Sequence, residues 1–278
     1  LCTALLGILA GVDTKAQEEK ELTFGLTQEE EDYVSNLRGT TLLFGVTEAS
    51  AYGLDVDGNE IGTAVPLLQF LEYELDLEIE VVEKNWEDAY KSIKDGTVDI
   101  LFDVPVASGQ AEGLYCSAAI YETTLLMLVN RGKTSEEISG SYCGIAGIVK
   151  DSAAVYAAEA PLLSAKEVRS FEGTTQMLEA LEEGTIESCF LTQNASSQVY
   201  DRPQFRIEAT YPQMVIPLGA ATASEDLEPL IDIFNRFMVG TEEGDAFRVQ
   251  VENEKQRYDI EQFVKNEEIV VDVQFENG

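Results

Sequence analysis

The sequence contains no histidine. This absence excludes Ser-His-Asp and Cys-His catalysis, histidine metal ligands, a phosphoacceptor histidine within this chain and the usual proton shuttle at neutral pH. An enzymatic function would therefore have to use carboxylates, lysine, tyrosine or cysteine. Carboxylates are abundant, but nothing in the sequence places two of them together as acid–base catalysis would require. We expect no catalytic residues, no metal site and no cofactor.

Cysteine is scarce, with four residues at Cys2, Cys116, Cys143 and Cys189. They form no CxxC pair, which leaves a zinc ribbon or a thioredoxin-type motif without support. Cys2 lies beside an apolar N-terminal stretch, outside the expected folded domain. The other three allow one disulfide and one free thiol, or buried free cysteines, and the sequence leaves both alternatives open.

Basic residues are few: 18 lysines and arginines stand against 52 acidic residues, a formal net charge of -34. Such a field repels nucleic acid and anionic lipid, so we expect no nucleic-acid partner. The acidic residues are spread along the whole chain, which is typical of a solvated acidic surface. The hydrophobic fraction of 45% is ordinary for a globular protein, and 278 residues are enough for two lobes.

Long hydrophobic runs are also absent. The apolar run at 5–12 is too short to cross a bilayer and is typical of the end of a signal peptide, with a cleavage site near Ala16. An uncleaved membrane anchor that is truncated at its start remains the alternative. Both interpretations predict an extracytoplasmic protein. A polar linker follows, and Thr27 with Glu30 predicts a capping box at a helix start.

Apolar periodicity predicts two successive β-α-β-α-β units. The strands of the first unit are expected at 42–46, 79–82 and 98–104, with helices at 64–77 and 86–94 and a tight turn at 57–59. A connecting strand at 123–129 leads to the second unit, with strands at 144–149, 167–171 and 186–191 and helices at 153–159 and 174–183. The chain then returns through 214–218 to helices at 227–239 and 244–264, before a strand-like tail at 268–275.

This alternation predicts an α/β protein with two lobes, each a mostly parallel sheet flanked by helices. Ligands in such sheets bind beyond the carboxyl ends of the strands, here between the lobes. The expected divisions are a signal or anchor remnant with linker (1–36), the first part of lobe 1 (37–125), lobe 2 (126–210), the return to lobe 1 (211–264) and a tail leading to a further module (265–278).

Several segments match one known family in order and spacing. They are an opening strand at 37–47, an Asp-Gly turn at 57–62, a Trp-to-Asp helix and strand at 86–100, a "CS…YET" segment at 116–123, and a strand with its loop at 144–153. Together they resemble the bacterial extracellular solute-binding proteins of family 3, which have the type II periplasmic-binding (Venus-flytrap) fold. The resemblance covers about 37–264. It implies a receptor for a small ligand, either in transport or as the sensor of a membrane signalling protein.

The charged groups with which this family binds amino acids are missing at the matching positions. Gln110 stands where the family has an arginine that binds the ligand carboxylate. Thr192 and Gln193 stand where an acidic residue holds the ligand ammonium, and Pro66 replaces an aspartate at a helix start. The resemblance therefore implies an altered polar or aromatic pocket, or none.

The candidate ligand-binding residues lie in loops after predicted strands or at the hinge. They are Glu48, Ser50, Tyr52, Ser108, Gln110, Ser117, Tyr121, Ser152, Thr192 and Gln193. The alternative for the loop residues is an ordinary surface loop, for Tyr121 hinge packing and for Ser152 a plain helix cap.

Three functions follow from this sequence. The first is an extracytoplasmic sensor domain of a membrane signalling protein, favoured by the tail that continues past the expected domain end. The second is the substrate-binding component of an ABC importer, with a permease as partner. The third, and least favoured, is an enzyme on the same fold, such as a cyclohexadienyl dehydratase-like protein, since a fold does not fix a function.

Overall fold

A computed structural model describes residues 25–47, 52–84, 86–134, 136–137, 144–150, 152, 154, 165–193, 199, 202–210 and 213–276, with side chains at all of these except 86–87, 209 and 262–276. The predicted signal segment, Glu48, Ser50, Cys2, Cys143 and nearly all of the predicted helix at 153–159 lie outside the described residues. Cys116 and Cys189 are free thiols.

The first helix begins at the predicted capping box. α1 spans Gln28–Leu37; the Thr27 hydroxyl accepts a hydrogen bond from the Glu30 amide at 3.3 Å, and the Glu30 carboxylate accepts one from the Thr27 amide at 2.7 Å. These bonds satisfy amides that have no partner within the helix, which explains why the helix starts there.

The first lobe contains three parallel strands in the order β4 (Glu78–Lys84), β1 (Thr41–Thr47) and β5 (Ile100–Pro105). The returning strand β12 (Val215–Thr222) pairs antiparallel with β5. The helical segments of this lobe are α2 (Val65–Gln69), the π-helix η1 (Phe70–Glu74), α3 (Trp86–Asp95), α4 (Val106–Ala111), η3 (Glu225–Leu227) and α9 (Glu228–Met238). Its core is aromatic, with Phe44, Phe102 and Phe234 fully buried.

The second lobe repeats this arrangement. Its parallel strands are β10 (Ser188–Thr192), β8 (Ile145–Val149) and β9 (Glu167–Phe171), with helix α8 (Thr174–Glu182) packed against them. The long strand β7 (Tyr121–Asn130) pairs antiparallel with β10, and β11 (Phe205–Ala209) pairs with β7. The predicted fold class, an α/β protein with two lobes, is thus confirmed.

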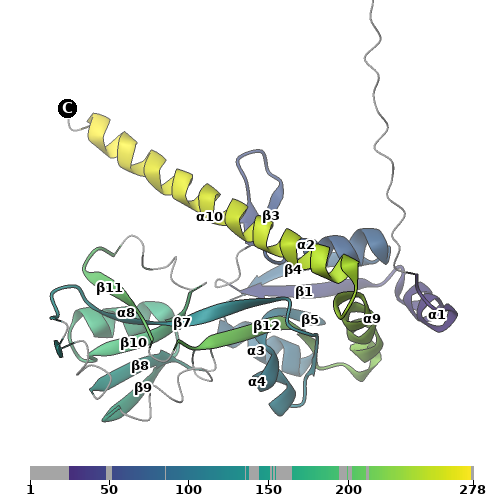
Figure 1. The fold of residues 1–278 in the computed structure, drawn as a ribbon, viewed down its shortest axis with the longest axis horizontal. Coiled ribbons are helices and arrows are strands. Elements are labelled where there is room, and N and C mark those ends of the chain that lie inside the picture. Colours follow the sequence, from purple (N-terminus) through teal and green to yellow (C-terminus); the bar gives the residue numbers. More distant parts are fainter. Residues whose placement is uncertain are drawn as a thin grey trace, which may run out of the picture.

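The lobes are joined where two strands cross from one to the other (Figure 1). Along β12, residues Val215 to Leu218 pair antiparallel with Tyr121 to Thr124 of β7. This pairing links the two sheets into one hydrogen-bonded path, β4-β1-β5-β12-β7-β10-β8-β9. A movement of one lobe relative to the other must therefore bend or twist the β7–β12 strand pair.

A small hairpin and a long helix complete the fold. Strands β2 (Tyr52–Leu54) and β3 (Glu60–Gly62) form the hairpin around the predicted turn, and helix α10 runs over Glu242–Glu276. In Figure 1 α10 passes along the β3 hairpin, and its last turns extend away from both lobes. Searched over the described part of the chain, the helices include none with the length and apolar character needed to span a bilayer.

The expectation of a strand-like tail at 268–275 is wrong, because these residues continue α10. The run of β-branched residues there favours a strand only when a neighbouring strand completes its hydrogen bonds. Extending an existing helix adds one hydrogen bond for each residue fixed, so the tail follows the helix before it.

Candidate functional site

A buried carboxylate lies close to the place where the lobes meet. Asp103 is only 4% exposed, and its backbone has φ = 64° within β5. The register of β5 against β12 shifts here, so that Phe102 and Asp103 together oppose the single residue Ala220. This is a β-bulge, which redirects a side chain and is common beside functional sites. A left-handed φ is unfavourable for a residue with a side chain and persists only where its surroundings enforce it.

Tyr121 is the partner of this carboxylate. It is the first residue of β7, its hydroxyl donates to Asp103 Oδ1, and its ring stacks on Phe102 with the centroids 6.1 Å apart. The ring packs against the apolar clusters of both lobes. Of the predicted site residues, Tyr121 therefore bridges the lobes most directly.

Gln193 lies beside the same crossing strand. Its backbone amide donates to the Thr124 carbonyl at 2.8 Å, and its side-chain oxygen accepts from the Thr124 hydroxyl at 3.0 Å. Thr124 is three residues beyond Tyr121 on β7, and Thr192 is the buried last residue of β10. The carboxyl end of β10 is thus fastened to the crossing strand, near the start of that strand.

Ser117 has a structural role. Its hydroxyl donates to the Ala118 carbonyl at 2.8 Å and accepts from the Ala220 amide at 2.9 Å, and the side chain is buried. These bonds fasten the end of β6 (Tyr115–Cys116) to β12. The contacts between Ser117 and β12 are close, because a Cβ atom at Gly219 would lie 2.6 Å from the Ser117 hydroxyl.

The remaining predicted residues lie at other places. Ser108 is buried and Gln110 exposed on α4, which directly follows β5. Ser152 donates its hydroxyl to the Val149 carbonyl at 2.8 Å in the turn after β8. Tyr52 donates to Glu60 at 2.6 Å within the hairpin. The described contacts thus bring Tyr121 and Gln193 to the crossing strand and leave Tyr52 on the hairpin.

Sequence reasoning missed Asp103. It stands inside an otherwise apolar run, Ile100–Pro105, that forms a buried strand. A charged residue in such a run is rarely buried without a partner, and this was the available signal. The strain at Asp103 and its bond to Tyr121 could be found only from the tertiary structure.

Two hollows on the surface lie away from these residues. One, of about 360 Å³, is lined by Leu26–Gln28, Glu31, Phe70, Glu74 and Leu75. The other, of about 400 Å³, is lined by Asn130, Lys133, Glu137, Gly184, Ile186 and Glu187. None of the predicted site residues lines either hollow.

The described thiols are poorly suited to nucleophilic chemistry. Burial raises the pKa of the Cys116 thiol to about 11 and raises the pKa of Cys189 still further. Because the thiolate is the reactive form, both are unreactive at neutral pH. Among the residues whose placement is described, no cluster of three or more acidic or cysteine side chains could hold a metal ion.

Neither family models nor curated proteins match this sequence. Solved structures do match its fold. The periplasmic VFT2 domain of BvgS from Bordetella pertussis has a TM-score of 0.62 and 16% identity, covering 81% of this chain and 98% of that one. An ancestral arginine-binding protein bound to glutamine has a TM-score of 0.55 and 17% identity, covering 74% and 95%.

A third structure is the ancestral amino acid-binding protein AncCDT-1, a precursor of cyclohexadienyl dehydratase. Its TM-score is 0.54 at 17% identity, with 84% of this chain and 97% of that chain covered. Identities this low show a shared fold and no more. The chain has the two-lobed α/β fold of these periplasmic binding proteins.

Proposed function

We propose that this chain is an extracytoplasmic domain that binds a small polar molecule between its lobes and serves as the sensor of a membrane signalling protein. The observation that carries the proposal is the crossing of β7 and β12. There the two lobes share a strand pair, and Tyr121, held by buried Asp103, contacts the cores of both lobes. A residue in this position is sensitive to the angle between the lobes.

The proposed ligand class rests on two predicted site residues. Gln110 on α4 and Gln193 after β10 are neutral and carry both hydrogen-bond donors and acceptors. A neutral polar ligand fits them better than a zwitterion, because neither residue offers the full charge that an amino acid's carboxylate or ammonium requires. The proteins of similar fold include arginine- and glutamine-bound receptors, so amino acids belong among the compounds to be tested.

The sensor role is supported by the long C-terminal helix and by the likeness to the BvgS VFT2 domain. A change in lobe angle could be passed on through such a helix as a shift between two populated conformations. The second candidate is the substrate-binding component of an ABC importer, which the ancestral arginine-binding protein favours. An adjacent permease gene would support the importer, and a transmembrane helix with a kinase or cyclic-di-GMP region downstream would support the sensor.

The binding proposal is tested by a thermal-shift screen against amino acids, peptides, sugars, organic acids and nucleosides. A ligand that binds only the folded protein raises the melting temperature, because at a concentration 100 times Kd it adds about 2.7 kcal/mol to the free energy of unfolding. Calorimetry then gives Kd for each hit, and small-angle scattering reports lobe closure. If no compound in the panel raises the melting temperature, the binding proposal is rejected.

The pocket assignment is tested with Gln193→Ala and a matched control, Gln256→Ala. Gln193 is bonded to the crossing strand, whereas Gln256 lies exposed on α10 with a bond to Glu252 in the same helix. We expect Gln193→Ala to weaken binding of the identified ligand about tenfold, because the hydrogen bonds between the Gln193 side chain and the ligand would be worth on the order of 1 kcal/mol or more. Gln256→Ala should leave Kd unchanged. We also expect that Gln110→Arg alone does not create amino-acid binding, since the ammonium would still lack a partner.

A further inference from the structure

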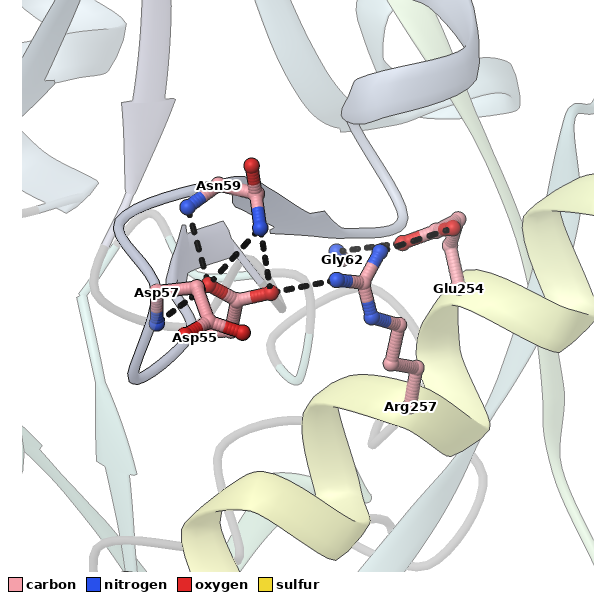
Figure 2. Close-up of polar contacts among 6 residues, drawn as sticks. All are labelled: Asp55, Asp57, Asn59, Gly62, Glu254 and Arg257. Atoms are coloured by element: carbon pink, nitrogen blue, oxygen red, sulfur yellow. Dashed lines mark hydrogen bonds and ion pairs between the residues drawn. The ribbon is translucent and has the colours of Figure 1, made fainter. Parts of the chain in front are cut away.

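The β2–β3 hairpin is stiffened from within by one carboxylate. Asp55 accepts hydrogen bonds from the backbone amides of Asp57 at 2.9 Å and Asn59 at 2.8 Å, and from the Asn59 side-chain amide at 3.0 Å. Figure 2 shows these bonds converging on the Asp55 carboxylate. The bonds from Asn59, those from Asp57 and the nearby Arg257 lower the pKa of Asp55 to about 2. The turn therefore carries a negative charge at its centre at neutral pH.

The same carboxylate receives an arginine from α10. The Arg257 guanidinium is ion-paired with Asp55, whose side chain is only 10% exposed, although the two residues are far apart in the sequence. Arg257 also lies 3.6 Å from Glu254, one turn earlier on α10. Glu254 in turn accepts from the Gly62 amide at 3.5 Å, at the other end of the hairpin (Figure 2). One face of α10 thus contacts the turn after β2 and the last residue of β3.

An apolar contact accompanies these polar ones. Gly53 of β2 faces the Tyr258 ring so closely that an added Cβ atom would lie 3.4 Å from Tyr258 Cε2. Burial raises the pKa of Tyr258. The start of α10 is held separately, because Phe247 and Val251 are part of the first lobe's core. The hairpin is therefore a contact that α10 makes in addition to this anchored start, and the helix also lies close to α2 and β7.

The hairpin lies between the first lobe and α10. The hairpin directly follows β1, and its Tyr52 packs against the core of the first lobe, which Tyr121 at the crossing also contacts. The hairpin also packs against α10 before that helix leaves the lobes (Figure 1). We propose that the β2–β3 hairpin is a latch that couples the ligand-binding junction to α10, with Asp55 and Arg257 as its ionic contact. This inference rests on the proposed sensor function and adds the route by which a change in the lobes reaches the helix.

The latch is tested first without ligand, by hydrogen–deuterium exchange of the whole chain. Arg257→Gln should speed amide exchange in the hairpin and in α10 beyond residue 257 by about threefold, because an ion pair with one exposed partner stabilises modestly. The matched control is Arg248→Gln, which removes an exposed arginine of the same helix that pairs with Asp245. If Arg257→Gln and Arg248→Gln give the same exchange in both segments, the latch is refuted.

Coupling is tested by loosening the hairpin at Asn59, whose side chain bonds to Asp55 within the turn. Asn59→Ala removes the side-chain bonds to Asp55 and should speed exchange in α10 beyond residue 257. In an Arg257→Gln background it should have no further effect on α10, since the connection is already broken. An Asn59→Ala effect on α10 that persists in that background would overturn the assignment of Arg257 to the latch.

The ligand arm separates this inference from the proposed function. With a compound found by the screen, bound protein should show altered exchange in both the hairpin and α10, and Arg257→Gln should abolish only the α10 response. A ligand response that reaches α10 equally well in Arg257→Gln refutes the latch while leaving binding intact. The absence of any ligand refutes the proposed function, and the latch itself is still decided by the two ligand-free experiments.

Discussion

Asp103 shows how one residue can combine strain with a specific contact. Its left-handed backbone is unfavourable by on the order of 1–3 kcal/mol, and its carboxylate is buried at the junction of the lobes. The hydrogen bond from Tyr121 offsets part of the desolvation of that carboxylate. Glycine would relieve the strain but would remove the contact with Tyr121.

Removing the Tyr121 hydroxyl should therefore destabilise the folded protein. We expect Tyr121→Phe to lower the free energy of unfolding by about 1–3 kcal/mol, because a buried carboxylate loses a hydrogen bond while its burial remains. Denaturant titration measures the change. The control is Tyr73→Phe, since Tyr73 is 77% exposed and its change should stay within about 0.5 kcal/mol. Equal effects of the two substitutions would contradict the role assigned to the pair.

Cys116 offers a pH prediction at the same scale. Burial raises its pKa to about 11 in the folded state, so the neutral thiol is favoured by folding. The protonated Cys116 thiol therefore adds to the free energy of unfolding. This stabilisation is fully present below the ordinary thiol pKa and is lost as the pH rises towards about 11. Alkylation read at the Cys116 peptide by mass spectrometry should be slow at pH 8 in the native protein and fast in denaturant. Equal rates in the two states would show that the thiol is not protected.

Among the elements, the corner between β5, α4 and β6 tolerates little change. A Cβ atom at Gly109 of α4 would lie 2.6 Å from the Cys116 sulfur and 2.9 Å from a Val104 methyl group. We expect Gly109→Ala to destabilise the protein by about 1–3 kcal/mol through overpacking. Gly132→Ala is the control, because an added Cβ atom there meets nothing within 4 Å. A thermal melt that does not distinguish the two variants would contradict the close packing of this corner.

Some elements could be predicted from local pattern and others could not. The strand at 167–171 was predicted with its observed limits, and α8 within one residue, because each combines apolar spacing with clear turn residues. Strand β11 (Phe205–Ala209) was not predicted, because its charged Arg206 and Glu208 resemble a surface loop until β7 supplies a pairing partner. Local spacing also predicted one helix over 64–77, whereas the chain widens from α2 into the π-helix η1, which ends at Glu74.

For the whole molecule, the net charge of -34 is the dominant electrostatic property. Like charges on a compact surface repel, and salt screens them over a Debye length of about 10 Å at 0.1 M. We expect the melting temperature to rise as sodium chloride is increased from about 10 mM to about 150 mM. Calorimetry at constant pH measures this effect. A melting temperature that falls with salt would mean that specific ion pairs outweigh the general repulsion.

The sequence of this chain was sufficient for features that depend on near neighbours. The alternation of strands and helices in the lobes, the capping box of α1, the Asp57–Asn59 turn and the excess of acidic residues all follow from spacing or composition within a few residues. The absence of histidine likewise excluded whole classes of chemistry. Tertiary structure alone decided the β7–β12 crossing, the bond between Asp103 and Tyr121, and the contact of Arg257 with the hairpin. These join residues that are distant in the sequence, and local propensity carries no information about which distant groups will meet.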